Sequence, residues 1–528
     1  MTIRIPKLSE IPPEEQTPLV GMLLEVIHGQ QEQIQQLKDE IARLKGQTPR
    51  PTIKPSTLEK PDKPEAVASE KRPGSAKRTK TVELVIHEEK VIKPEEEIPQ
   101  GSRFKGYQDY VVQDIEIKSH NIVYRLERWQ TPEGRTLRGR LPAEIAGSHF
   151  GTVLQSFILY QYYHAHVTQP LLLEQLHDWG IDISSGQLSA ILLTGNEACH
   201  TEKDEILSTG LEISGYINVD DTGARHNGKN GYCTHIGNEL FAWFKSTDSK
   251  SRINFLDLLR TGHTDYVMNG KALEYMALQG LSSQVMMKLV ERMPRVLPDA
   301  LEWSLRLDEL GITDARHVRI ATEGAMLGSL YEHGFNPDLV IVSDDAGQFN
   351  IVQHALCWIH TERLINKLIG FTEQHKETLE STRGEIWNLY TALKQFKKNP
   401  EEKTKALIDA EFDRIFTKTT CFINLNQALK RIHKNKAELL LVLKRPDIPL
   451  HNNTSENDIR EYVKRRKISG STRSDPGRQC RDTFTSLKKT CRKLGVSFWS
   501  YLKDRVSHAG HIPPLPALMR SAALKQTF

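Results

Sequence analysis

Two short apolar runs of the chain each end in a pair of adjacent aspartates. Residues 216–219 are followed by Asp220 and Asp221, and residues 339–343 are followed by Asp344 and Asp345. Runs rich in β-branched residues predict central strands of an α/β sheet, and carboxylates at the ends of such strands lie where open α/β sheets bind ligands. A later acidic residue, Glu456, falls at the start of a predicted helix. Two strand-end aspartates and a helical glutamate suggest one divalent-metal site.

The doubled aspartates leave a choice open. Neighbouring side chains on a strand point to opposite faces, so only one aspartate of each pair can face the metal directly. The other would lie past the strand end, where it could orient water or cap the following turn.

Glu456 has a second interpretation that involves no chemistry. Asn453 as a helix N-cap, with Glu456 three residues later, has the pattern of a capping box. The two interpretations are compatible, because a cap would also fix the carboxylate.

The length of the chain favours a protein of several domains, and its cysteine pattern favours a reducing compartment. A length of 528 residues exceeds one ordinary domain. The formal net charge is only +4, and the six cysteines form no tight repeated pairs. We find no signal peptide and no apolar run near the roughly 18 residues that span a bilayer. The expectation is a cytoplasmic protein without a membrane partner.

The N-terminal region carries a seven-residue apolar repeat that predicts a coiled coil over residues 14–46. Its a positions are Val20, Ile27, Ile34 and Ile41, and its d positions are Leu23, Leu37 and Leu44, with Gln30 as the polar exception. Ile at a with Leu at d favours a parallel two-stranded coil, hence a homodimer or higher homo-oligomer; one amphipathic helix packed on its own domain is the alternative. Residues 47–81, rich in Pro and Lys, predict a disordered linker.

Two small modules are expected before the first acidic strand. Residues 82–145 predict a small β module, with strands near 111–117 and 122–126 and a turn at 131–134. Residues 150–205 are typical of a helix-turn-helix-like region, with Ser184 or Ser185 as the cap of its second helix and Gln187 as a DNA contact. Helical hairpins of this outline also arise from packing alone.

The remaining chain predicts an α/β catalytic core interrupted by helices. Two more strands, 231–238 and 241–244, follow the first acidic strand. Core segments are expected at 210–250, 335–370 and 450–505, helical insertions at 251–334 and 371–449, and a C-terminal tail at 506–528. Cys357 and His360 have the spacing of two zinc ligands, but no partner pair is evident. Packing and positioning of the site are favoured there, and no structural zinc is expected.

A basic run lies between residues 464 and 493. Eleven Lys and Arg residues stand against Asp475 and Asp482, which gives a local net charge of +9 (11 − 2). Such a run predicts a surface that follows a phosphate backbone, and a solvated helix face is the alternative.

Several motifs in this order carry a family resemblance. They are 218–222 (Asn-Val-Asp-Asp-Thr), Ser343-Asp344 with Phe349, 357–360 (Cys-Trp-Ile-His), and Asn452-Asn453 with Glu456 and Arg460. Together they resemble the DDE transposases of the insertion sequence 66 family over roughly residues 10–505. The chain departs from the family in lacking a Cys-rich zinc-binding module, and in having Asp221 where Glu is common.

The resemblance implies a ribonuclease-H-like fold that holds two Mg²⁺ ions, with Mn²⁺ as a substitute. It assigns Asp220 as the bridging ligand and Asp344 and Glu456 to one metal each, since the family register favours the first aspartate of each pair. The implied supporting residues are Asp221, Asp345, Trp358, His360 and Asn453. The implied DNA contacts are Arg363, Arg460, Lys464, Arg465, Arg466 and Arg473, in addition to Gln187.

The implied activity is that of a bacterial, nucleoid-associated transposase. It would bind the terminal inverted repeats of its element, cleave the ends and join the 3′-OH ends to target DNA, with accessory proteins of the same element as further partners. Three alternatives remain open: a metal-dependent nuclease without strand transfer, a catalytically inactive DNA-binding regulator, and a coiled-coil scaffold.

Overall fold

The computed structural model describes residues 85–142 and 148–526, together with six residues near the N-terminus: Thr17, Val20, Leu23, Val26, Ile27 and Gln30. The chain divides into two compact units, Met1–Ile117 and Lys118–Phe528. Val20, Leu23, Ile27 and Gln30 are helical; the rest of the expected coiled coil and the expected linker lie outside the described residues. Within the described part of the chain, no helix combines the length and apolarity that crossing a bilayer requires.

The structure of residues 85–142 differs from the small β module predicted for this region. Residues 85–127 contain no strand, so the strands expected near 111–117 and 122–126 do not form. A two-stranded hairpin, β1 (Arg128–Gln130) and β2 (Thr136–Arg138), instead flanks the predicted turn. The apolar residues of the predicted strands are exposed, for example Ile115 and Val123. A strand needs a partner that buries one of its faces, and the described residues supply none here.

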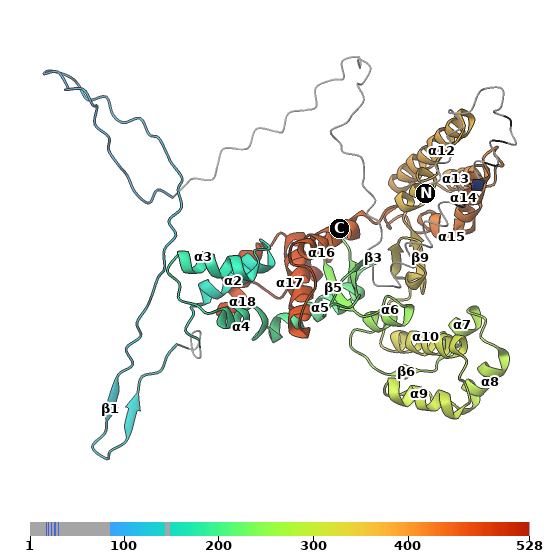
Figure 1. The fold of residues 1–528 in the computed structure, drawn as a ribbon, viewed down its shortest axis with the longest axis horizontal. Helices are drawn as coiled ribbons and strands as arrows, with labels where there is room; N and C mark the ends of the chain where they lie inside the picture. The colour runs from blue at the N-terminus through green and yellow to red at the C-terminus, as the bar shows by residue number, and fades with distance from the viewer. Residues whose placement is uncertain are drawn as a thin grey trace, which may run out of the picture. The chain divides into compact units, whose positions relative to one another are not determined.

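A mixed five-stranded sheet forms the centre of the second unit (Figure 1). Its strands are β3 (Tyr216–Gly223), β4 (Tyr232–Gly237), β5 (Ala242–Thr247), β8 (Val340–Ser343) and β9 (Gln353–Leu356). Their order is β5-β4-β3-β8-β9; β3, β4 and β5 pair antiparallel, whereas β8 pairs parallel with β3 and β9. The fold is therefore a helix-rich α/β arrangement in which β3 and β8 are neighbours. Strand β3 continues to Gly223, so Asp220 and Asp221 lie within it and not at its end as predicted, whereas Asp344 directly follows β8.

Alternate residues of these strands enter different cores. Ile217, Val219 and Ile341 belong to the largest hydrophobic core, which the helices before β3 and the first insertion complete. Val340 and Val342 face the second core, formed with the helices of the second insertion. Both faces of the sheet are thus covered by hydrophobic cores. This explains why the sequences of these strands are nearly continuous apolar runs.

Within the described residues 148–215, four helices lead to the sheet: α2 (Thr152–Tyr163), α3 (Gln169–Asp178), α4 (Ser185–Leu193) and α5 (Glu197–Ile213). Helix α4 begins with a capping box, in which the Ser184 hydroxyl accepts from the Gln187 N–H and the Gln187 side chain accepts from the Ser184 N–H. Leu172, Leu176, Leu188 and Leu192 of α3 and α4 are buried in the main core.

Two insertions divide the core segments, and only the first lies between strands of the sheet. The first lies between β5 and β8 and consists of α6 (Arg252–Leu259), β6 (Tyr266–Val267), α7 (Gly270–Leu278), α8 (Ser283–Arg292), β7 (Val296–Leu297), α9 (Ala300–Glu309) and α10 (Ala315–Glu332). The second follows α11 (Trp358–Asn366) and consists of α12 (Glu373–Lys398), α13 (Glu402–Phe416), α14 (Ile423–Lys434) and α15 (Lys436–Leu439).

Four helices complete the chain: α16 (Asn453–Ser469), α17 (Asp475–Lys493), α18 (Phe498–Ser507) and α19 (Leu515–Gln526). The segment expected to be a C-terminal tail therefore contains α19. Leu515 and Met519 of this helix are fully buried in the main core, and α19 packs against α5.

Side chains of α17 satisfy the outer edge of strand β5. The backbone N–H groups and their acceptors are Ser246 with Asp482 (2.6 Å), Phe244 with Ser486 (2.9 Å), and Ala242 with Thr490 (3.2 Å). The strand partners are two residues apart, or about 6.8 Å, and the helix partners are four residues apart, or about 6.0 Å. Because the two spacings are similar, the three pairs remain aligned along the strand and the helix. Helix α17 thereby closes an edge that would otherwise present unpaired donors.

Candidate active site

The register between β3 and β8 brings the first aspartates of the two pairs together. Tyr216 pairs with Val340, and Asn218 pairs with Val342. Two residues further along both parallel chains, the same register leads to Asp220 and Asp344. Two segments more than 120 residues apart in sequence thus deliver carboxylates to one end of the sheet.

Helix α16 covers the face of β3 that carries Asp220. The Asn452 side chain, fully buried, donates to the Val219 carbonyl and accepts from the Asn218 amide, both at 2.8 Å. These two bonds fix the start of α16 on the strand immediately before Asp220. Glu456 lies one turn into the helix, which places the third carboxylate over the same end of the sheet.

A second buried link, which the sequence analysis missed, holds α16 on strand β4. The His235 ring contacts the Ser455 hydroxyl at 2.6 Å and the Asp458 carboxylate at 3.3 Å. Lys493 of α17 completes the group with a 2.8 Å ion pair to Asp458. No sequence signal identifies this link, because its members come from three elements that only the fold brings together.

The electrostatics of Asp220 show that the three carboxylates share one environment. Burial raises the pKa of Asp220 to about 7, and the negative charges of Asp344, Asp221 and Glu456 add to the rise. The N–H of Asp221, which donates to the Asp220 carboxylate at 2.8 Å, acts in the opposite direction. A half-buried acidic group of this kind is stabilised by a cation, and carboxylate oxygens are the ligands that Mg²⁺ prefers.

Asp221 points to the opposite face of β3. Its carboxylate accepts from the Thr234 hydroxyl at 2.5 Å and from the Gln348 amide at 3.0 Å. Burial raises its pKa, while these two hydrogen bonds lower it. Thr234 and Gln348, which the sequence analysis did not single out, therefore hold the second aspartate of the first pair.

Asp345 is also turned away from the other carboxylates. It pairs with Arg431 at 2.6 Å and accepts from Asn435 at 3.3 Å, so it joins the end of β8 to helix α14 and the residues that follow it. Asp344 instead accepts the N–H of Ala346, two residues later, at 3.1 Å.

The capping-box interpretation of Glu456 is wrong. The N-cap of α16 is Asn452, not Asn453, and no side chain caps the helix, because Asn452 uses its amide on β3. The Glu456 carboxylate lies 3.3 Å from Arg363 and 3.6 Å from His360. Its side chain is thus available for a role at the site. Asn453 is exposed.

The Cys-Trp-Ile-His motif builds the wall next to Glu456. Cys357 accepts the backbone N–H of Asn452 at 3.2 Å, and the buried Trp358 ring donates to the Leu439 carbonyl at 3.0 Å. His360 accepts from Arg363 at 3.1 Å. Burial, followed by the Arg363 charge, lowers the pKa of His360, which favours a neutral imidazole at pH 7.

The residues expected to contact DNA divide into exposed and buried groups. Arg460, Lys464 and Arg473 are exposed, and Arg363 is partly exposed beside Glu456. Arg465 is only 4% exposed; it donates to the Tyr162 carbonyl at 3.0 Å and stacks on the Tyr162 ring. Arg466 is half-buried and bonds Thr222 at 3.1 Å at the end of β3. The expectation that Arg465 lies on the DNA-facing surface is therefore wrong, because this cation anchors α16 to α2.

The basic run as a whole is less exposed than its composition predicts. Arg481, Lys488 and Lys489 are each 8% exposed. Lys488 pairs with Glu461, and Lys489 lies 3.3 Å from Asp458. The run therefore contains cations that stabilise packing as well as cations that face solvent.

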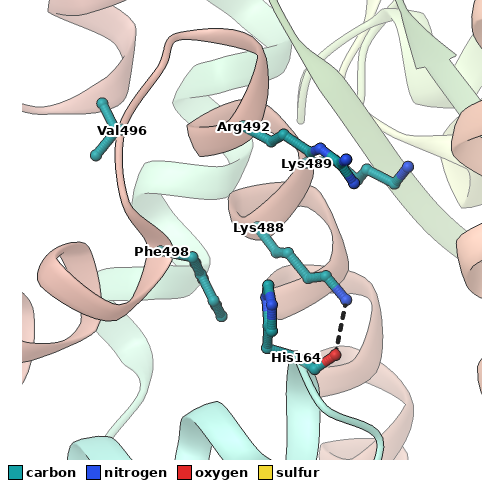
Figure 2. Close-up of a pocket in the computed structure, with 6 residues that line it drawn as sticks. All are labelled: His164, Lys488, Lys489, Arg492, Val496 and Phe498. Atoms are coloured by element: carbon teal, nitrogen blue, oxygen red, sulfur yellow. Dashed lines mark hydrogen bonds between the residues drawn. The ribbon is translucent and has the colours of Figure 1, made fainter. Parts of the chain in front are cut away.

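Part of this run lines a pocket of about 340 Å³ between α17 and the end of α2. Its walls are His164, Lys488, Lys489, Arg492, Val496 and Phe498. Figure 2 shows Lys488 donating to the His164 carbonyl, at 3.2 Å, with Lys489 and Arg492 on the same helix. Arg492 is the exposed cation of the group.

Comparisons with known proteins identify the family of the chain. Residues 331–480, which include Asp344, the Cys-Trp-Ile-His motif and Glu456, match the family model "Transposase IS66 family". The chain is 45% identical over 321 residues to "Uncharacterized protein y4jO" of Sinorhizobium fredii (strain NBRC 101917 / NGR234), a match that covers 60% of this chain and 100% of the relative. The matched region indicates the class of the protein, a transposase. The chain belongs to the IS66 family of transposases, which confirms the family inferred from the motifs.

Proposed function

We propose that this protein is a DDE transposase with a ribonuclease-H-like core. The strand order β5-β4-β3-β8-β9, with β4 antiparallel to a central β3, supports this core. The observation that carries the proposal is the convergence of three carboxylates from distant segments, Asp220, Asp344 and Glu456, at one end of the sheet. The charges of the other two contribute to the raised pKa of Asp220.

The donor set fits two Mg²⁺ ions, with Mn²⁺ as a substitute. Asp220 would hold both ions, and Asp344 and Glu456 one each. Carboxylate oxygens are the ligands that Mg²⁺ prefers, and the two ions of such a site lie about 4 Å apart. When bound, such ions activate the attacking oxygen and stabilise the leaving 3′ oxygen of a phosphodiester.

The surrounding residues would position the DNA and the carboxylates. Arg363 and Arg460 lie 3.3 and 3.8 Å from Glu456, and their exposed guanidinium groups would bind backbone phosphates beside the site. Asn452 and His360 would hold Glu456 in place. Asp221 and Asp345, bonded to Thr234 and Arg431, would support the two strand ends from outside the metal site.

A cleavage and joining assay tests this function. A labelled duplex that carries an end of the element is incubated with the full chain, a target plasmid and Mg²⁺. We expect 3′-OH ends and their joined products, both abolished by Asp220→Asn, while the variant still binds the duplex. Cleavage without joining would instead establish a nuclease, and binding without cleavage a regulator.

Further DNA contacts would come from exposed cations and from the helical region before the sheet. Lys464, Lys467, Arg473 and Arg492 are exposed and would contact backbone phosphates. Helices α3 and α4 would form the helix-turn-helix-like reader of the terminal repeats. The Gln187 carbonyl oxygen is engaged in the cap of α4, so base contacts would use its amide group.

Self-association would come from the N-terminal repeat. Leu23 and Ile27 are helical and exposed, as expected for seam residues that a second copy would cover. Deletion of residues 14–46 should lower the mass measured by light scattering. An unchanged mass would contradict this role.

A further inference from the structure

A second cluster of metal-binding side chains lies in the first insertion, away from the three carboxylates. It consists of His263 and Asp265, in the segment between α6 and β6, and His333, the C-cap residue of α10. One ligand atom from each residue lies within 4.8 Å of the others. Among the described residues this is the group of three potential ligands that meets this spacing.

The two imidazoles lie face to face, so one ring has to turn about its side-chain torsions for both rings to direct a nitrogen at one cation. Their rings stack with centroids 3.6 Å apart and planes inclined by 8°. The His333 Nε2 atom lies 3.0 Å from both oxygens of Asp265. Within the described residues, the ring nitrogens of His263 have no hydrogen-bond partner. One nitrogen donor is thus unused beside a carboxylate and a second imidazole.

The backbone and its neighbours hold the cluster in place. Thr261 and Gly262 both have positive φ, 52° and 98°, so the chain reverses tightly before His263. The Ser329 hydroxyl donates to the Asp265 carboxylate at 2.9 Å, and Arg260 donates to the Asp265 carbonyl at 2.7 Å. A ligand carboxylate held by a hydrogen bond is the usual arrangement at protein metal sites.

We propose that His263, Asp265 and His333 form a site for a transition-metal cation of the Zn²⁺ type. Two imidazole nitrogens and one carboxylate oxygen suit Zn²⁺, whereas Mg²⁺ prefers oxygen ligands alone. The histidines line an open cavity of about 380 Å³, so a water molecule can reach the fourth position. The site is independent of the acidic triad and of its function.

The position of the site gives the cation a structural role. His263 and Asp265 lead into β6, and His333 ends α10, whose chain continues into β8 and Asp344. The cation would therefore join the α6–β6 segment to the helix that precedes the second acidic strand. Metal binding that requires the folded arrangement stabilises the folded state.

Cobalt binding to the full, untagged chain tests the proposal directly. The protein is first treated with a chelator, dialysed, and then titrated with Co²⁺ in excess Mg²⁺, which fills the acidic triad. We expect one tightly bound Co²⁺ per chain with the intense visible absorption of a tetrahedral site, displaced by Zn²⁺. Zn²⁺ should also raise the melting temperature by several degrees.

Matched variants assign the ligands. His263→Ala and Asp265→Asn should lose the visible absorption and the thermal shift, and Ser329→Ala should weaken binding about 10-fold. His317→Ala is the control, since His317 also lies on α10 beside an aspartate, Asp314, at 3.7 Å but has no third ligand within the described part of the chain. It should bind Co²⁺ as the wild type does.

The proposal is overturned by either of two outcomes. One is a wild-type chain without tetrahedral Co²⁺ absorption under these conditions. The other is a His263→Ala protein, with a normal circular dichroism spectrum, that binds Co²⁺ as tightly as the wild type. Because His263 is exposed on a loop, this variant is expected to fold, and the measurement does not depend on transposition.

Discussion

Helices α16 and α17 follow one another in the chain and are both rich in charge, but they use that charge differently. The charged residues of α16 that face the sheet end and solvent, Glu456, Arg460 and Lys464, remain accessible. Helix α17 turns Arg481, Asp482, Lys488 and Lys489 inward, where each is no more than 8% exposed. Helix α16 therefore carries accessible charged groups at the proposed site. Helix α17 covers the edge of β5 and supplies cations to buried carboxylates.

The comparison shows that a local charge count does not measure a binding surface. A buried ion retains its charge only where distant partners offset the loss of water. Such partners exist for α17, including Glu461, Asp458 and the N–H groups of β5. The distinction between the two helices leads to experiments that separate catalysis, positioning, stability and DNA binding.

The largest effect is expected from the aspartates that α16 faces. Asp220→Asn and Asp344→Asn should lose end cleavage by several orders of magnitude, because the ligands of the proposed metal ions are removed. Asp221→Asn and Asp345→Asn should lose only about 10- to 100-fold, since these residues act through other groups. Cleavage in Mg²⁺ is measured for all four, with melting temperatures as the folding control. A larger loss for the second member of a pair would reverse the assignment on that strand.

The next effect concerns the attachment of α16. Asn452→Ala removes two buried hydrogen bonds and leaves the Val219 carbonyl and the Asn218 amide without them, which should cost about 1–3 kcal/mol of stability. Glu456 then loses its fixed position, so cleavage should fall about 10- to 100-fold. Asn453→Ala, at the neighbouring exposed position, is the control and should change neither quantity appreciably. Equal losses for the two variants would contradict the positioning role of Asn452.

The attachment of α17 should affect stability rather than chemistry. Asp482→Ala leaves the N–H of Ser246 unpaired in a buried position, which should cost about 1–3 kcal/mol. Asp475→Ala, at an exposed position of the same helix, should cost less than about 1 kcal/mol. Chemical denaturation of both variants measures the difference. A similar cost at the two positions would mean that the edge bonds of β5 contribute little.

The raised pKa of Asp220 predicts a dependence of stability on pH. Its pKa is about 7 in the folded chain against an ordinary value of 3.8 for an aspartate, so folding favours the protonated form. The stabilisation that this group contributes is therefore complete below about pH 4 and is lost as the pH rises through about 7. In the presence of a chelator, Asp220→Asn should melt higher than the wild type at pH 8 and similarly at pH 4. A variant that melts lower at pH 8 would contradict this origin of the shift.

The smallest effect is on the salt dependence of DNA binding. Lys464→Ala removes one exposed cation and should lower the slope of log K against log salt by about 1. Lys488→Ala removes a buried cation, so it should lower the melting temperature and leave the slope nearly unchanged. The two slopes are compared by fluorescence anisotropy on one duplex. A larger slope change for Lys488 would show that the basic run binds DNA as its composition suggested.

Much of the site could be inferred from the sequence because its signals are local. Apolar runs such as residues 339–342 are typical of buried strands, so the positions of Asp220 on β3 and of Asp344 directly after β8 followed from the chain itself. The Asn452-Asn453 pair likewise marked the start of α16. Strand β9, by contrast, is four residues long and contains His354, and it had no clear apolar signal.

Tertiary structure decided which side chains of these elements meet. The sequence offered two aspartates per strand, and the helix that packs on β3 selected the face of Asp220, since strand residues alternate between faces. From the sequence alone, Glu456 could have belonged to a capping box. The structure excludes this, because the N-cap is Asn452 and its amide is bonded to β3. His263 and His333, 70 residues apart, converge only through the packing of α10. Burial of charge and convergence of ligands depend on partners remote in sequence, and these remain undetermined until the chain is folded.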